Sequence, residues 1–176
     1  MKKAPKQIEM DNNRRIATDM LNAAMTYARL ILKKYGELGP FGFGMDREGQ
    51  IARETVEIPR LPRDPERLWK LLDEHMAERV RRGWIQALAM GANVLLPEPS
   101  AEGFRDAVVL NIETDQGYAV QLTVPYRIYG GQLKNLLPRR IALGKMQMED
   151  AVCRFFTPGE PGLALENSRD IHPSGA

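Results

Sequence analysis

The sequence predicts an α+β protein, a two-layer sandwich whose mainly antiparallel five-stranded sheet carries two long helices on one face. Two segments, 16–32 and 68–80, place apolar residues three and four positions apart, as in helices with one buried side. Two others, 41–58 and 108–128, alternate large residues with small or polar ones around short turns, as in hairpins. The expected order is helix, two strands, helix and three strands.

The first helix is expected to begin at Asp11 or Asn12, whose side chains can accept hydrogen bonds from the unpaired N–H groups of a helix start. It should end near Gly36, because glycine adopts the left-handed conformation that commonly closes a helix. Residues 1–10 are expected to form a flexible basic tail. The apolar stripe consists of Ile16, Ala17, Met20, Leu21, Ala24, Tyr27, Ala28, Ile31 and Leu32.

The first hairpin follows directly, with strands expected over 41–45 and 50–58. Its turn is Asp46-Arg47-Glu48-Gly49, in which Gly49 supplies the positive φ that a short bulged hairpin needs. Gly42 and Gly44 alternate with large residues in the first strand and weaken it by entropy. Their presence predicts that another part of the chain packs closely over that side of the strand.

The second helix starts with Asp64-Pro65-Glu66, which combines an acidic N-cap, a proline at the first helical position and an acid in the first turn. Gly83 closes it, after basic residues that complement the negative end of the helix dipole. Its buried side is expected to consist of Leu68, Leu71, Leu72, Met76 and Val80.

Alternation predicts three further strands, over 88–96, 108–112 and 118–128. The last of them has the most regular alternation in the chain, and it contains Pro125. Proline has no N–H group to donate to a neighbouring strand. We therefore expect the N–H side of Pro125 to face outward, at a sheet edge or at a bulge.

Residues 11–156 are expected to form a single α+β domain, because no linker divides them and the length is typical of one domain. Residues 131–156 show no sustained period, which is compatible with an irregular strand, a short helix over 149–155 or a segment that wraps around the domain. Residues 157–176 are rich in proline, glycine, serine and polar residues, which predicts a disordered tail.

The composition is that of an ordinary globular protein, with 43% apolar and 27% charged residues. The formal net charge of +2 is too small to predict a polyanionic partner, so no nucleic-acid partner is expected. The single cysteine, Cys153, excludes an intramolecular disulfide and favours a reducing compartment. No segment has the apolar character of a signal peptide or a bilayer span, so we expect a cytoplasmic protein without membrane contact.

No catalytic, metal or nucleotide motif stands out, so no catalytic residue, metal ligand or cofactor is assigned. His75 and Glu78 could share one face of a helix, but a catalytic zinc usually takes three protein ligands. The only other histidine, His172, lies in the predicted tail. Cys153 has a basic neighbour but no evident histidine base, which favours a buried inert thiol over a nucleophile.

Two further groups of charged residues have an ordinary structural explanation. The carboxylate pairs Glu54 with Glu57 and Glu98 with Glu102 lie beside prolines in expected surface connections, where solvation keeps them ordinary acids. A basic and aromatic patch for nucleic acid could combine residues at the end of the second helix with the arginine pair at 139–140. Its members would be Arg79, Arg81, Arg82, Trp84, Arg139 and Arg140, but arginines at a helix end already complement the dipole.

Aromatic residues at strand spacing could line a ligand pocket between the first hairpin and the helices. The candidates are Phe41, Phe43 and Tyr126. The same spacing is typical of a core, which is the alternative interpretation.

The order of elements over residues 11–130 resembles that of roadblock, profilin-like and GAF-like domains. These are small sensing and scaffolding domains, so the resemblance implies a function of that kind.

The leading hypothesis is a bacterial cytoplasmic protein that acts without catalysis through protein association, as a scaffold, regulatory or immunity-like module. Unpaired edge strands often pair with a second copy or a partner, so we expect a homodimer through an edge strand or the first helix. Several of the nine methionines, among them Met146 and Met148, would suit an adaptable packing surface. The alternative is a small-molecule sensing domain, and the third hypothesis is an enzyme whose site no motif reveals.

Overall fold

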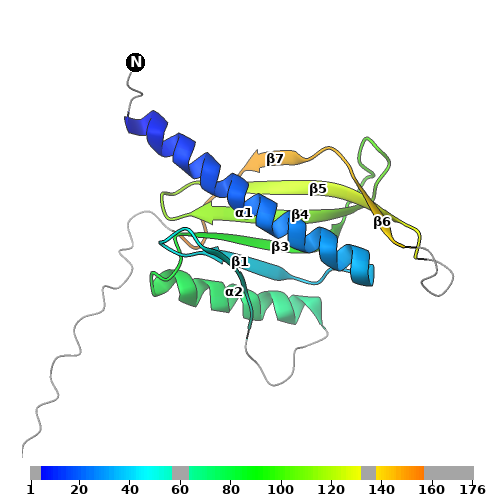
Figure 1. Ribbon diagram of the computed structural model, residues 1–176, viewed down its shortest axis with the longest axis horizontal. Helices are drawn as coiled ribbons and strands as arrows, with labels where there is room; N and C mark the ends of the chain where they lie inside the picture. The colour runs from blue at the N-terminus through cyan, green and yellow to red at the C-terminus, as the bar shows by residue number, and fades with distance from the viewer. Residues whose placement is uncertain (1–4, 57–63, 132–137, 157–176) are drawn as a thin grey trace, which may run out of the picture.

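The computed structural model describes residues 5–56, 64–131 and 138–156 (Figure 1). These residues form two helices and one seven-stranded antiparallel sheet in the order β2-β1-β3-β4-β5-β6, with β7 also paired to β5. The predicted α+β class with an antiparallel sheet is confirmed, and the sheet has two strands more than expected. The predicted C-terminal tail, 157–176, lies outside the described residues.

Helix α1 (Pro5–Tyr35) lies across one face of the sheet (Figure 1). It begins before both expected N-caps, Asp11 and Asn12, so residues 5–10 of the predicted tail belong to the helix. A proline suits the first helical turn, and no helix-breaking residue follows it. Gly36 ends the helix as predicted, with a φ of 80° and its N–H donating to the carbonyl of Leu32 at 2.8 Å.

The first hairpin is formed by β1 (Phe41–Met45) and β2 (Ile51–Glu54). The Asp46 carboxylate accepts hydrogen bonds from the backbone N–H groups of Glu48 at 3.0 Å and Gln50 at 2.7 Å. Gly49 has a φ of 83°, as the predicted turn requires. The return strand is shorter than the predicted 50–58, since it ends at Glu54, and residues 57 and 58 lie outside the described residues.

The two faces of β1 carry different helices. Phe41, Phe43 and Met45 belong to the core beneath α1. A Cβ on Gly42 would lie 3.2 Å from the Leu72 side chain of α2 (Pro65–Arg81), so α2 packs on the opposite face. The predicted close packing over Gly42 is confirmed, whereas the expectation that both helices share one face is corrected, because the glycine side of β1 has room for a second helix.

Helix α2 has the predicted ends. The Asp64 side chain accepts from the N–H of Glu66 at 3.1 Å, Pro65 is the first helical residue, and Gly83 follows the helix with a φ of 66°. Its apolar side forms a second, smaller core that consists of Leu72, Met76, Ile85, Leu88, Met90 and Phe156.

The centre of the sheet consists of β3 (Ala87–Leu95), β4 (Asp106–Thr114) and β5 (Ala119–Tyr129), close to their predicted bounds. Residues of β3 alternate between the two cores, with Ala87 and Ala89 beneath α1 and Leu88 and Met90 toward α2. A sheet with one helix on each face needs apolar residues on both sides of its central strands. This requirement explains why the apolar residues of β3 alternate between the two cores.

Two short strands, β6 (Arg140–Leu143) and β7 (Gln147–Asp150), occupy the region that showed no sustained period. Both pair with β5, and the break between them lies beside Pro125, whose carbonyl accepts from the N–H of Gly144 at 2.7 Å. The N–H and C=O groups of a strand residue point the same way, so the missing donor of Pro125 faces this break. Between the two pairings, residues 124–125 of β5 face residues 144–146, which is the predicted bulge. The prediction that this side of Pro125 faces outward is wrong, because the segment at Gly144 covers it.

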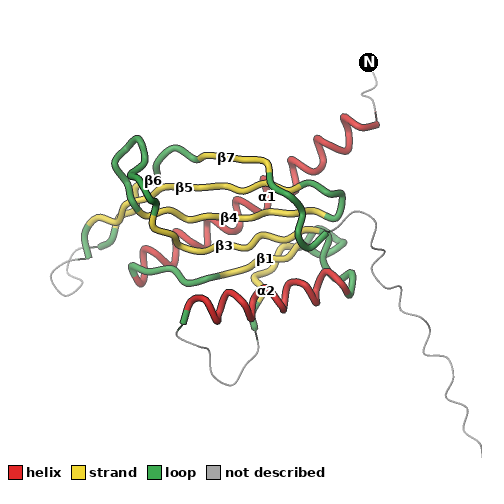
Figure 2. The backbone as a smooth tube through the Cα atoms, turned by 180° about the vertical axis from the view of Figure 1, so that it is seen from behind, coloured by secondary structure: helices red, strands yellow, loops and turns green. Residues whose placement is uncertain are grey.

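The chain then crosses the second face of the sheet as a C-terminal strap, residues 151–156 (Figure 2). The carboxylate of Glu113, 5% exposed on β4, accepts from the backbone N–H groups of Arg154 at 2.9 Å, Phe155 at 2.8 Å and Phe156 at 3.4 Å. Arg154 also forms an ion pair with Asp73 of α2. The strap is thereby joined to both β4 and α2.

Candidate functional site

The residues of the predicted ligand pocket, Phe41, Phe43 and Tyr126, are all buried in the core beneath α1. The rings of Phe41 and Phe43 contact Tyr27 of α1, with centroid distances of 5.2 and 5.8 Å. Tyr126 lies on β5, beyond β3 and β4, where its hydroxyl donates to Asn93 Oδ1 at 2.8 Å. The structure brings the two phenylalanines together and leaves Tyr126 apart from them, and ligand binding by these residues stays a prediction.

Burial and then the nearby charge of Asp106 raise the pKa of Tyr126 to about 12. In the unfolded chain a tyrosine pKa is about 10, so this side chain contributes stability that is fully present below about pH 10 and is lost as the pH rises through about 12. We expect an ultraviolet absorbance titration of the folded protein to show one phenol that ionises about two pH units after an ordinary tyrosine. Tyr126→Phe should remove this late ionisation. A late ionisation that persists in this variant would contradict the prediction.

His75 pairs with Glu54 of β2 and not with Glu78. Its Nε2 lies 2.9 Å from Glu54 Oε2, and a guanidinium nitrogen of Arg79 lies 3.1 Å from Glu54 Oε1. The Glu78 carboxylate instead forms ion pairs with two arginines at the end of α2. No group of three metal-ligating side chains occurs in the described part of the chain. The Glu54 cluster therefore joins β2 to α2, while Glu57 and His172 lie outside the described residues.

Cys153 lies in the C-terminal strap and is half-buried. Burial and then the charge of Glu113 raise the pKa of its thiol. A raised pKa lowers the fraction of nucleophilic thiolate, which supports the interpretation of Cys153 as an inert thiol.

The predicted basic patch divides into two separate groups. Arg79 and Arg82 lie over the ring of Trp84, 5.0 and 4.8 Å from its centroid, near the β1 side of the sheet. Arg139 and Arg140 lie at β6, on the opposite side of the sheet, beyond β3, β4 and β5. The structure does not bring the two groups together, so they do not form one surface for nucleic acid.

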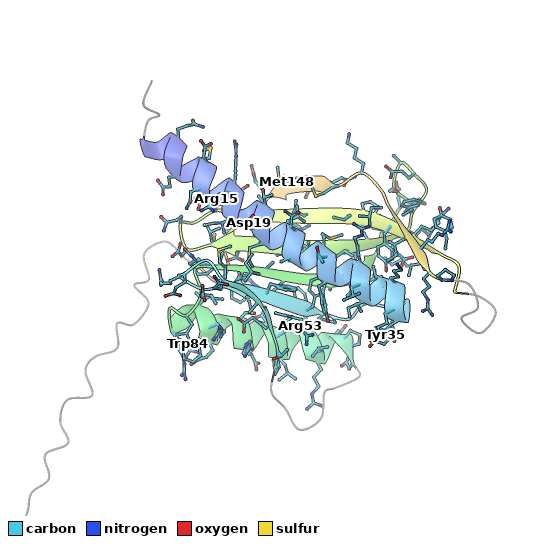
Figure 3. The ribbon with its side chains drawn as sticks, viewed as in Figure 1. Arg15, Asp19, Tyr35, Arg53, Trp84 and Met148 are labelled. Atoms are coloured by element: carbon cyan, nitrogen blue, oxygen red, sulfur yellow. The ribbon has the colours of Figure 1, made fainter. Side chains whose placement is uncertain are left out.

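The edge of the sheet formed by β6 and β7 exposes large apolar side chains. We call Leu143, Met146 and Met148 the edge patch; they are 41%, 44% and 63% exposed. Leu143 is opposite Tyr126 and Met148 is opposite Leu122, so both lie on the α1 face of the sheet. Figure 3 shows Met148 on β7, at the margin of the molecule.

Glu102 anchors the segment between β6 and β7, in the middle of this edge. Its carboxylate accepts from the backbone N–H of Lys145 at 3.0 Å and from the hydroxyl of Ser100 at 2.9 Å. The hydrogen bond from Lys145 and then the one from Ser100 lower the pKa of Glu102, so the carboxylate is charged at neutral pH. The edge segment between β6 and β7 is therefore anchored to the loop before β4.

The edge patch was not identified as a site from the sequence. The sequence predicts only that several methionines, Met146 and Met148 among them, suit an adaptable surface, and it places Met20 and Met76 on the apolar sides of the two helices. The structure separates these methionines, since Met20 and Met76 are fully buried and the pair at the edge is exposed. The available signal is the alternation of Met146 and Met148 with polar and charged residues over a span too short to establish a strand.

Comparison of the chain with protein-family models, with curated proteins and with solved structures finds no match. The resemblance to roadblock, profilin-like and GAF-like domains therefore rests on the order of elements alone. Neither of the two described helices combines the length and the apolar composition that are needed to cross a membrane.

Proposed function

We propose that this protein is a non-catalytic association module that forms a homodimer through β7 and the residues just before it. The observation that carries the proposal is the outer side of β7, with which no strand pairs among the described residues. Unpaired backbone N–H and C=O groups at a sheet edge are a template for another strand. The exposed edge patch lies along the same segment and adds apolar surface to it.

A second copy of this chain is the partner that the segment matches best. Two copies can pair antiparallel about a two-fold axis at Gln147, which makes the contact self-complementary and closed. Met146 of each copy then lies opposite Met148 of the other, and Lys145 lies opposite Glu149. Apolar and opposite-charge pairs at facing positions stabilise antiparallel strands, whereas facing like charges destabilise them.

Sedimentation equilibrium at micromolar concentrations tests this dimer. Glu149→Lys should weaken dimerisation about tenfold, because it places two lysine pairs across the two-fold axis. The double variant Lys145→Glu/Glu149→Lys should restore it, since the pairs are again of opposite charge. Leu95→Lys is the matched control, because Leu95 is 69% exposed on β3, away from this edge, and should leave the dimer unchanged. A wild-type chain that is monomeric throughout, or no difference between Glu149→Lys and the control, would refute the proposal.

The dimer supports a scaffold, regulatory or immunity-like role, in which one copy presents surfaces to a further protein. Small-molecule sensing at Phe41, Phe43 and Tyr126 remains the alternative hypothesis, and an enzyme of another type remains the third. Both stay predictions.

A further inference from the structure

A pocket of about 520 Å³ opens between the C-terminal half of α1 and strand β6. This volume lies within the usual range for small-molecule sites. None of its lining residues belongs to the edge patch. The lining combines four basic side chains with two apolar ones, namely Arg29, Lys33, Arg139, Arg140, Leu30 and Ile141.

The positive charge of this pocket is not neutralised within the described part of the chain. No carboxylate there pairs with Arg29, Lys33 or Arg140. Positive charges that line one pocket repel each other, and an anion bound among them offsets that repulsion. The arrangement therefore favours a ligand with more than one negative charge.

Arg139 is held in position by the end of α1. Its guanidinium donates to the backbone carbonyl of Lys34 at 2.9 Å and lies against Gly36, where a Cβ would come within 3.0 Å of Nε. A guanidinium that is already oriented loses less side-chain entropy when it binds an anion. This part of the pocket is thus organised before a ligand arrives.

The other residues of the pocket indicate which chemical group of a ligand would lie next to its negative charge. Leu30 is 61% exposed beside the basic residues, and Ile141 lies across the pocket from it on β6. The methylene groups of arginine and lysine add further apolar surface. Thr26 is the seventh residue of the lining. A ligand that fits both parts carries an apolar group next to its charge.

We infer that this pocket binds a small phosphate monoester with an attached apolar or aromatic group. A phosphate monoester carries close to two negative charges at neutral pH and offers three oxygens to the planar forks of arginine. This site is independent of the proposed dimer, because the two involve different residues.

Isothermal titration of the full chain with phenyl phosphate, inorganic phosphate and phenol tests the inference. Phenyl phosphate should bind more tightly than inorganic phosphate, and phenol should not bind. Arg29→Gln should weaken the binding of phenyl phosphate about tenfold by removing one charged contact. Leu30→Ser should weaken the binding of phenyl phosphate and leave that of inorganic phosphate unchanged.

Arg14→Gln is the matched control, because it removes the same charge from an exposed position of α1 that does not line the pocket. It should change the affinity less than twofold, and thermal unfolding should show that all variants are folded. Equal losses in Arg14→Gln and Arg29→Gln, or no binding of phenyl phosphate at millimolar concentration, would overturn the inference. Tighter binding of single-stranded DNA or of anionic lipid vesicles through the same arginine would overturn it in favour of a macromolecular surface.

Discussion

Replacing Glu113 by alanine should lower the free energy of unfolding by about 3–5 kcal/mol, because three buried or partly buried N–H groups lose a charged acceptor. These groups belong to Arg154, Phe155 and Phe156 of the C-terminal strap. The strap also places Phe156 in the second core, so its release should expose that core as well. Urea denaturation measures the loss of stability, and hydrogen exchange should become faster at residues 154–156.

Two variants separate the role of Glu113 from that of other contacts of the strap. Glu113→Gln keeps one acceptor oxygen without the charge, so its cost should be about 1–2 kcal/mol. Asp73→Asn breaks the ion pair with Arg154, whose side chain is 56% exposed, and such pairs contribute less than about 1 kcal/mol. The account fails if Glu113→Ala is no more destabilising than Asp73→Asn.

Gly91→Ala should lower the free energy of unfolding by about 2–3 kcal/mol, because the added methyl group overpacks the core beneath α1. A Cβ at this position would lie 2.5 Å from both Leu110 Cδ2 and Phe41 Cζ. Both side chains are buried at 3% exposure or less, so they have little room to move away. Urea denaturation of the variant measures this cost.

Gly39→Ala is the matched control, because its Cβ would lie 3.9 Å from the nearest side chain and would meet no obstacle. It should be neutral or slightly stabilising, since alanine restricts the unfolded chain more than glycine does. Phe41→Leu removes the atom that the new methyl would meet, so the double variant should lose less stability than the sum of the two single ones. Strict additivity would show that the clash with Phe41 is not the cause.

The sequence alone was sufficient for features that depend on residues close together in the chain. Asp64-Pro65 starts α2, Gly49 closes the first hairpin, and the missing N–H of Pro125 coincides with a break in the sheet edge. In each case a single residue restricts its own backbone or its own hydrogen bonding, whatever packs against it later. The α+β class followed from the same local periods.

The candidate sites depend on contacts between residues far apart in the chain. The basic pocket combines Arg29 and Lys33 with Arg139 and Arg140, and no local pattern relates these two pairs. Glu113 is an ordinary strand residue in the sequence, and only the path of the strap shows that its carboxylate is a buried anchor.

The sequence by itself determined the two helices, the turns of the hairpins and the antiparallel class of the sheet. Only the tertiary structure decided that α2 lies opposite α1, that β6 and β7 complete the sheet, and which charged residues meet. The physical reason is that periodicity and capping act within one element, whereas the choice of face, edge and partner depends on packing summed over the whole chain. Gly42 shows the division, because its sequence position predicts close packing but does not say which element provides it.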